Sequence, residues 1–135
     1  MTTLEAIQAV YSHLKATDIQ SAITGRMCQI SRPKSSDKED VVVNCLGMPN
    51  DQLQKTIVNV NLFVPDKYVV IDGQHQLQPD TARLDYLTGL TIPLLTNQRF
   101  NGYWFDYQQH RVLHDRESGQ HFVNIRVNFY CFVST

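Results

Sequence analysis

The chain is poor in cysteine and has no long apolar run. Cys28, Cys45 and Cys131 are odd in number and widely spaced, which favours reduced thiols in a cytosolic protein over a disulfide framework. No apolar run approaches the ~20 residues of a membrane-spanning helix. The first residues lack a positively charged segment followed by an apolar one, so no signal peptide is expected. We therefore expect a soluble protein that is intracellular when synthesised.

The chain also lacks an excess of charge of either sign. Twelve Lys and Arg residues oppose 13 Asp and Glu, which leaves a net charge of -1. A free-standing DNA-binding protein usually carries a clear positive excess, so sequence-specific nucleic-acid binding is not expected. With 42% hydrophobic and 19% charged residues, the composition is that of a folded protein. Its length of 135 residues predicts a single domain over residues 1–135.

Catalytic motifs are missing as well. There is no Gly-x-Ser-x-Gly elbow and no Gly-Lys-Ser/Thr phosphate loop, which argues against the common hydrolases and P-loop enzymes. Pro65-Asp66 is similar to the opening of a metal-nuclease motif, but Lys67 is the last lysine in the chain. No later acidic-x-lysine strand can therefore complete such a site. We expect no enzymatic activity and no cofactor.

The residues that are present predict two helices. Apolar residues recur at spacings of three and four between Thr3 and Thr17, with Thr2 or Thr3 as the N-cap. A second helix is predicted to start after Asp80 as its N-cap. Gly89 weakens this helix, and Pro93 is expected to kink or end it.

Strand patterns fill most of the remaining chain. Residues 23–30, 40–46 and 55–64 predict three strands, and the last of them alternates cleanly until Pro65. Residues 103–107 and 109–114 predict one long or bulged strand, and residues 120–133 predict another beyond a turn at 115–119. The predicted fold is α+β: an N-terminal helix, a three-stranded antiparallel meander, a second helix and a C-terminal β-hairpin, with both helices on one face of the sheet.

Five histidines raise the question of a metal site. His110 and His114 lie in a stretch predicted to be extended, where four residues span about 13 Å. That distance is too long for a shared metal, although His121 across the turn could approach either of them. Surface histidines on a hairpin are the ordinary alternative, and no metal site is predicted.

Two segments are candidates for contact with other proteins. The polar stretch 31–40 is either a solvated connection or a docking arm, because it is longer than the usual hairpin loop. Aromatic residues concentrate at 100–107, where alternation places Trp104 opposite Tyr103, Phe105 and Tyr107. Trp104 is then either a partly exposed edge residue or part of a partner surface.

Several local runs, together with the order of elements, resemble the tail terminator (tail-completion) proteins of long-tailed bacteriophages. The runs are Ile23-Thr24-Gly25, Arg32-Pro33, Ser36, 39–44 (EDVVVN) and 58–66 (VNVNLFVPD). The resemblance covers most of the chain as an order of elements, and as sequence it rests on residues 23–66. The aromatic cluster at 100–107 has no counterpart in that family.

The resemblance implies a minor tail or head–tail joining protein that forms a homo-oligomeric ring, by analogy a hexamer, on the tail tube. Its partners would be copies of itself, the tube protein and the head connector. It would assemble in the host cytoplasm and end in the virion tail. The expected contact residues are Arg32, Lys34, Lys38, Asn59, Asn61, Trp104 and Arg126, with Asn124 and Asn128 on the same half-polar strand faces. Two alternatives stay open: a binding or adaptor domain unrelated to phage, and a small metal-dependent enzyme that uses the histidines.

Overall fold

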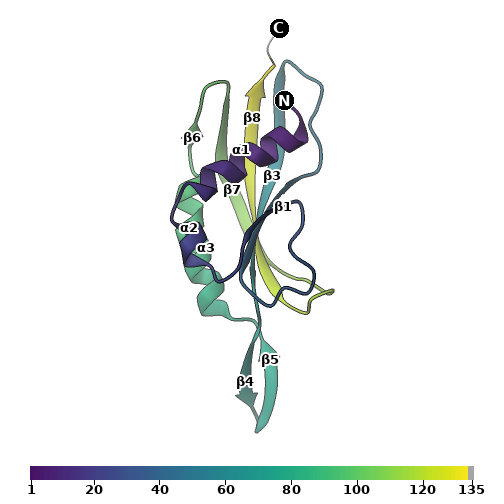
Figure 1. Ribbon diagram of the computed structural model, residues 1–135, viewed down its shortest axis with the longest axis vertical. Coiled ribbons are helices and arrows are strands. Elements are labelled where there is room, and N and C mark those ends of the chain that lie inside the picture. Colours follow the sequence, from purple (N-terminus) through teal and green to yellow (C-terminus); the bar gives the residue numbers. More distant parts are fainter. Residues whose placement is uncertain (134–135) are drawn as a thin grey trace.

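The chain builds a curled, six-stranded sheet with helices on one side and a separate hairpin that projects from one end (Figure 1). The computed structural model describes residues 1–133. In chain order the elements are α1 (Thr3–Lys15), α2 (Ile19–Ala22), β1 (Met27–Gln29), β2 (Asp40–Cys45), β3 (Leu53–Val64), β4 (Lys67–Ile71), β5 (Gln74–Gln78), α3 (Thr81–Leu95), β6 (Gln98–Arg99), β7 (Tyr103–His114) and β8 (His121–Phe132). The predicted α+β class is confirmed.

The sheet has the order β1-β2-β3-β8-β7-β6, so the two long strands β3 and β8 lie at its centre. They pair antiparallel along their whole length, from Leu53 opposite Phe132 to Val64 opposite His121. Every second residue of each strand is buried against the helices, as the sequence alternation predicted. These inward side chains form the middle of the hydrophobic core: Val58, Val60, Leu62, Val64, Val123, Ile125, Val127, Phe129 and Cys131.

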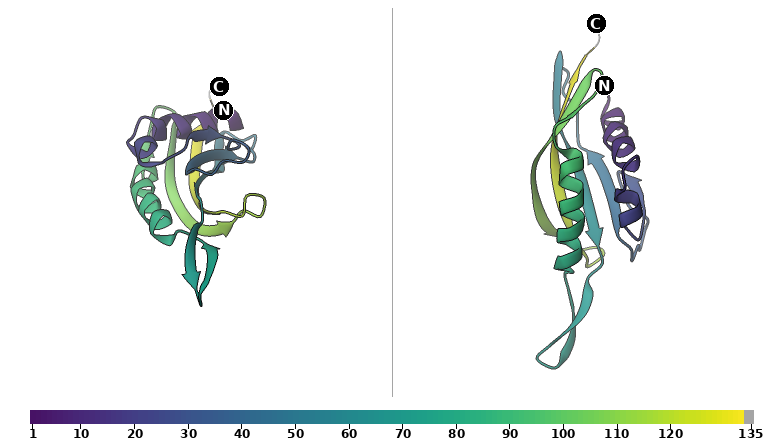
Figure 2. Two further views of the ribbon diagram at one scale, coloured as in Figure 1. Left: turned by 60° about the horizontal axis from the view of Figure 1, so that its bottom comes forward. Right: turned by 90° about the vertical axis from the view of Figure 1, so that its left-hand side faces the viewer.

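The two long helices, α1 and α3, pack against this inner face of the sheet (Figure 2, right). A capping box holds the start of α1, in which the Thr2 hydroxyl accepts a hydrogen bond from Glu5 N–H and the Glu5 carboxylate accepts one from Thr2 N–H. Asp80 caps α3 as predicted, by accepting from Arg83 N–H. Pro93 lies in the last turn of α3, which ends at Leu95. The proline therefore ends the helix within a turn, where few backbone hydrogen bonds remain to be lost.

The predicted antiparallel meander is wrong at its first strand. β1 has only three residues and pairs with β2 in parallel, with Met27 opposite Val41 and Gln29 opposite Val43. One bond to a buried acidic side chain and one backbone bond explain this arrangement. The Asp40 carboxylate accepts a hydrogen bond from the backbone N–H of Arg26, and Gly25 N–H donates to the carbonyl of Glu39. These two bonds hold the start of β1 beside the start of β2.

The prediction also missed the hairpin formed by β4 and β5. Its turn is Asp72-Gly73, with both residues at positive φ (52° and 78°). Two successive positive φ angles form the turn type that matches the twist of a two-residue hairpin, and Asp-Gly is a preferred sequence for it. Between the end of β3 and the start of α3, the hairpin points away from the six-stranded sheet in Figures 1 and 2.

Candidate contact surface on the outer face of the sheet

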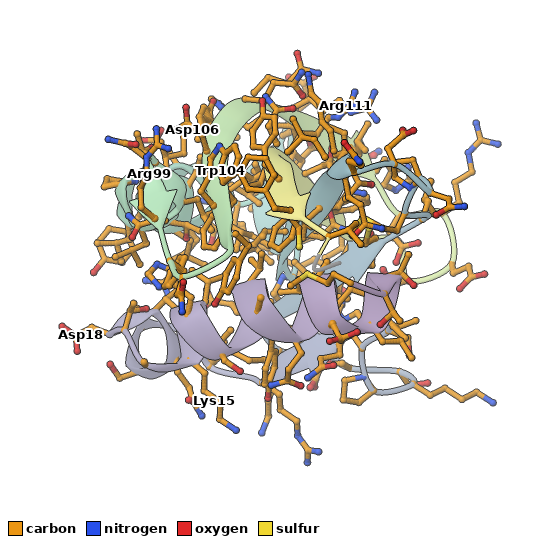
Figure 3. The ribbon with its side chains drawn as sticks, turned by 90° about the horizontal axis from the view of Figure 1, so that it is seen from above. Lys15, Asp18, Arg99, Trp104, Asp106 and Arg111 are labelled. Atoms are coloured by element: carbon orange, nitrogen blue, oxygen red, sulfur yellow. The ribbon has the colours of Figure 1, made fainter. Side chains whose placement is uncertain are left out.

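The side of the sheet opposite the helices, the outer face, collects most of the contact residues expected from the sequence. Strands β3, β8 and β7 place their alternate residues there in rows. Figure 3 shows Trp104, Asp106 and Arg111 on the side of the sheet away from α1, whereas Lys15 and Asp18 lie on the helical side. Of the expected residues, Asn59, Asn61, Trp104 and Arg126 share this face, with Asn124 and Asn128 beside them.

An aromatic row, Trp104, Tyr130 and Phe132, occupies one end of the outer face. The Trp104 and Tyr130 rings stack with centroids 5.1 Å apart, and the Phe132 ring lies 5.4 Å from Trp104. Arg99 lies over the Trp104 ring at 5.8 Å and Lys55 over the Tyr130 ring at 5.6 Å. Phe132 is still 60% exposed. This combination of apolar ring surface with flanking cations is typical of interface anchors.

The centre of the outer face is a chain of asparagine side chains. Asn59 Nδ2 donates to Asn44 Oδ1 at 3.1 Å, and Asn124 Nδ2 donates to Asn61 Oδ1 at 2.7 Å and to Asn59 Oδ1 at 3.1 Å. Asn124 is only 5% exposed, and its Oδ1 has no hydrogen-bond partner among the residues that the structure describes. A buried amide oxygen without a partner costs free energy, so this amide chain is held together at some expense to stability.

Two arginines border this amide chain. Arg111 of β7 lies opposite Asn124, and Arg126 of β8 lies opposite Asn59. They line a hollow of about 490 Å³ together with Leu46, Thr56, Ile57 and Asn59. Leu46 follows β2, and Arg111 belongs to β7, which is separated from β2 by two strands in the sheet. Because both residues line one hollow, the outer face must be concave (Figure 2, left). Within residues 1–133 neither arginine takes part in a salt bridge. The hollow therefore presents guanidinium donors suited to a carboxylate or a carbonyl oxygen.

The polar loop after β1 closes the other end of the outer face. Its Arg32 lies over the Phe63 ring at 4.4 Å, and its guanidinium donates to the Asp40 carboxylate at 2.8 and 2.9 Å and to Gln120 Oε1 at 2.8 Å. Arg32, one of the expected contact residues, is thus mostly occupied inside the chain. The other two contact residues expected on this loop, Lys34 and Lys38, are exposed. They are therefore accessible to a partner.

Two groups near this loop have shifted pKa values. Burial raises the pKa of the Cys28 thiol, and the nearby Asp40 carboxylate raises it further. The hydrogen bond to Glu39 raises the pKa of Arg83, whose guanidinium meets the two Glu39 oxygens at 2.7 Å. The first shift disfavours a reactive thiolate at Cys28. Arg83 is charged in any case, and its paired hydrogen bonds to Glu39 fasten α3 to the loop.

Of the three histidines near the turn between β7 and β8, two lie together. His114 and His121 stack with ring centroids 4.7 Å apart, and His121 Nδ1 lies 2.9 Å from the Asp66 carboxylate. His110 instead meets the Tyr107 hydroxyl. No set of three or more His, Cys, Asp or Glu side chains in the described part of the chain could hold a metal ion.

Sequence reasoning missed Arg111, Asn44 and Leu46 as members of this surface. The chain matches no protein-family profile, and none of the curated proteins matches it. None of the helices in residues 1–133 has the length and apolar character needed to cross a bilayer.

Proposed function

We propose that the chain is a structural subunit of a phage or prophage tail, which caps the tail tube or joins head and tail as part of a homo-oligomeric ring. The observation that carries the proposal is the outer face. It combines an aromatic row that ends in the exposed Phe132 with two arginines that make no salt bridge within residues 1–133. Such a surface fits a lasting protein contact.

The order of elements supports the tail assignment. A leading helix, a long loop before the central strands, a second helix and a closing hairpin remain after the correction at β1, and these are the features on which the resemblance rests. The proposed partners are other copies of the chain, the tube protein and the head connector. The exposed Lys34 and Lys38 belong to the loop that packs on Phe63 at one end of the outer face, and they extend the contact surface there.

Native mass spectrometry over a concentration series tests the proposal. We expect closed oligomers of one defined size, and rings with a central opening in negative-stain images. A chain that stays monomeric at every concentration, with and without a tail-tube protein, would contradict it. A monomer that forms a one-to-one complex with a single unrelated protein would favour the adaptor alternative.

Two variants test whether the outer face makes the contact. Trp104→Ala and Arg126→Glu should shift the oligomers toward monomer, because the first removes an aromatic anchor and the second reverses a charge in the hollow. Lys15→Glu on the helical side is the matched control and should leave the oligomers unchanged. Circular dichroism must show that all three variants keep the fold.

A further inference from the structure

The β4–β5 hairpin carries an apolar face that no part of the described chain covers. Tyr68 pairs with Leu77 and Val70 with His75, so these side chains point to one side of the hairpin. Tyr68, Val70 and Leu77 are 71%, 61% and 53% exposed. Among the described elements the two strands pair with each other only. Because an isolated two-stranded hairpin is marginally stable in water, this arm gains from docking on another surface.

The same chain has an open sheet edge along the second half of β7. The short strand β6 pairs with Trp104 and Phe105 and ends there. Residues 109–114 pair with β8 on one side, and no described strand pairs with them on the other. The bulge at Gln108 lies before residues 109–114, and these residues pair regularly with β8. An edge of this kind offers unpaired backbone N–H and C=O groups to an added strand.

An apolar groove adjoins this edge on the helical side of the sheet. It has a volume of about 190 Å³ and is lined by Leu84 and Thr88 of α3 together with Val112 and Val123. Val112 is 58% exposed, so the helix leaves this part of β7 uncovered. A strand added to the edge would lay its apolar side chains over Val112 and against α3.

We propose that the β4–β5 hairpin of one copy adds to the free β7 edge of a second copy, with β4 as the pairing strand. β4 has five residues, which matches the edge run 109–114. It places Tyr68 and Val70 side by side for the groove, and main-chain hydrogen bonds along the edge supply further affinity. The proposal deepens the proposed function and rests on it, since it names a second contact between copies in addition to the outer face.

Geometry favours a second copy as the occupant, and charge does not oppose it. Residues 67–78 hold one Lys and one Asp, a net charge of zero, so β4 meets no overall repulsion from segment 109–114, which has one Arg and no acid. The hairpin extends away from its own sheet in all three views, so it is positioned to reach the edge of another molecule (Figures 1 and 2). Donor and acceptor are different surfaces, which makes the contact heterologous and able to close into a ring.

Photo-crosslinking tests the contact directly. A variant carries the photo-crosslinker benzoylphenylalanine at position 68, in place of the exposed Tyr68. This variant is mixed with isotopically heavy wild-type chain and irradiated. The crosslinked peptides are then mapped by mass spectrometry. We expect crosslinks to residues 109–114 or to Leu84 and Asp85 of the heavy chain. Crosslinks elsewhere on the heavy chain, crosslinks confined to one chain, or none at all would overturn the proposal. The same probe at Leu4, which is 60% exposed on α1, is the control and should not label that edge.

A variant pair provides an independent measurement. Val70→Asp should weaken self-association at least about tenfold, as expected when an interface anchor is replaced by a charge. Its unfolding midpoint should stay near that of the wild type, because Val70 is exposed in the monomer. Leu4→Asp, at a site on α1 that is 60% exposed and away from both the β7 edge and the outer face, is the matched control. Equal self-association of Val70→Asp and the wild type would overturn the proposal.

These results separate this contact from the tail function. If closed rings form and the probe at position 68 crosslinks outside the β7 edge, the hairpin contact is overturned and the proposed function still stands. Crosslinks at the β7 edge in open dimers or filaments would support the contact and contradict a ring.

Discussion

Replacing Asp40 by alanine should be one of the most destabilising changes in the chain. Asp40 is 1% exposed, and its carboxylate accepts hydrogen bonds from three groups. These are the backbone N–H of Arg26 at 2.8 Å, the Arg32 guanidinium and the Ser36 hydroxyl at 2.5 Å. Asp40→Ala removes all three bonds and leaves a largely buried guanidinium without its counter-charge.

The size of the effect follows from that guanidinium. Removing one partner of a buried ion pair costs about 3–5 kcal/mol, because the remaining charge stays desolvated. The Arg32 side chain is 12% exposed, so it cannot recover much hydration without moving the whole loop. For a chain of this length, such a loss corresponds to a fall in Tm on the order of 10–20 °C. Asp40→Asn keeps an acceptor oxygen and should cost about half as much.

Urea unfolding followed by Trp104 fluorescence and circular dichroism measures the change in the free energy of unfolding. Asp37→Ala is the control, because Asp37 is an exposed acid in the same loop and should change stability by less than about 0.5 kcal/mol. In a double-mutant cycle, Arg32→Ala should cost much less in the Asp40→Ala background than alone. If Asp40→Ala and Asp37→Ala cost the same, the reasoning from burial is refuted.

Three further changes have defined outcomes. In Gly25→Ala the added Cβ would lie 2.3 Å from the Glu39 carbonyl oxygen. We therefore expect the free energy of unfolding, measured in urea, to fall by about 1–3 kcal/mol. Gly47 has open space around it, so Gly47→Ala is the control and should change this free energy little. Cys28 should react with iodoacetamide more slowly than a free cysteine, because burial raises its pKa; rapid alkylation of the folded chain would contradict this. The hydrogen bond from the Thr2 backbone N–H lowers the pKa of Glu5, so folding favours its carboxylate. This contribution to stability is present above the ordinary glutamate pKa and is lost as pH falls through the lowered value, and unfolding of the wild type and Glu5→Gln across that range measures it.

Local patterns were enough to predict α1, α3 and the central strands, although they missed the four-residue helix α2 (Ile19–Ala22). The alternation of Val58, Val60 and Leu62 with polar neighbours follows from one buried face and one open face, and β3 and β8 both have that environment. Thr2 and Asp80 cap their helices because their side chains satisfy backbone N–H groups a few residues away. All of these causes act within a short stretch of chain, and a single sequence therefore contains them.

The features that sequence reasoning missed depend on contacts between distant residues. Glu39 and Asp40 belong to a run with the composition of a solvated loop, yet Glu39 meets Arg83 and Asp40 meets Arg32, which in turn bonds to Gln120. Nothing in the composition of residues 31–40 distinguishes these buried acids from the exposed Asp37. The hairpin had a usable signal in Asp72-Gly73, but the glutamines of β5 hid the alternation around it.

The sequence left open whether residues 103–114 form one long or a bulged strand, and the bulge at Gln108 decides which face Arg111 occupies. Simple alternation from Tyr103 would place Arg111 on the same face as Phe105, toward the helices. The pairing instead moves from Tyr107 opposite Val127 to Gln109 opposite Arg126, so the extra residue puts Arg111 on the outer face beside Asn124. The same shift turns Val112 to the helical side, where it lines the apolar groove at the free edge. One inserted residue thus supplies an arginine to the outer hollow and an apolar side chain to the hairpin site. The two surfaces proposed to make contacts are therefore coupled through the register of a single strand.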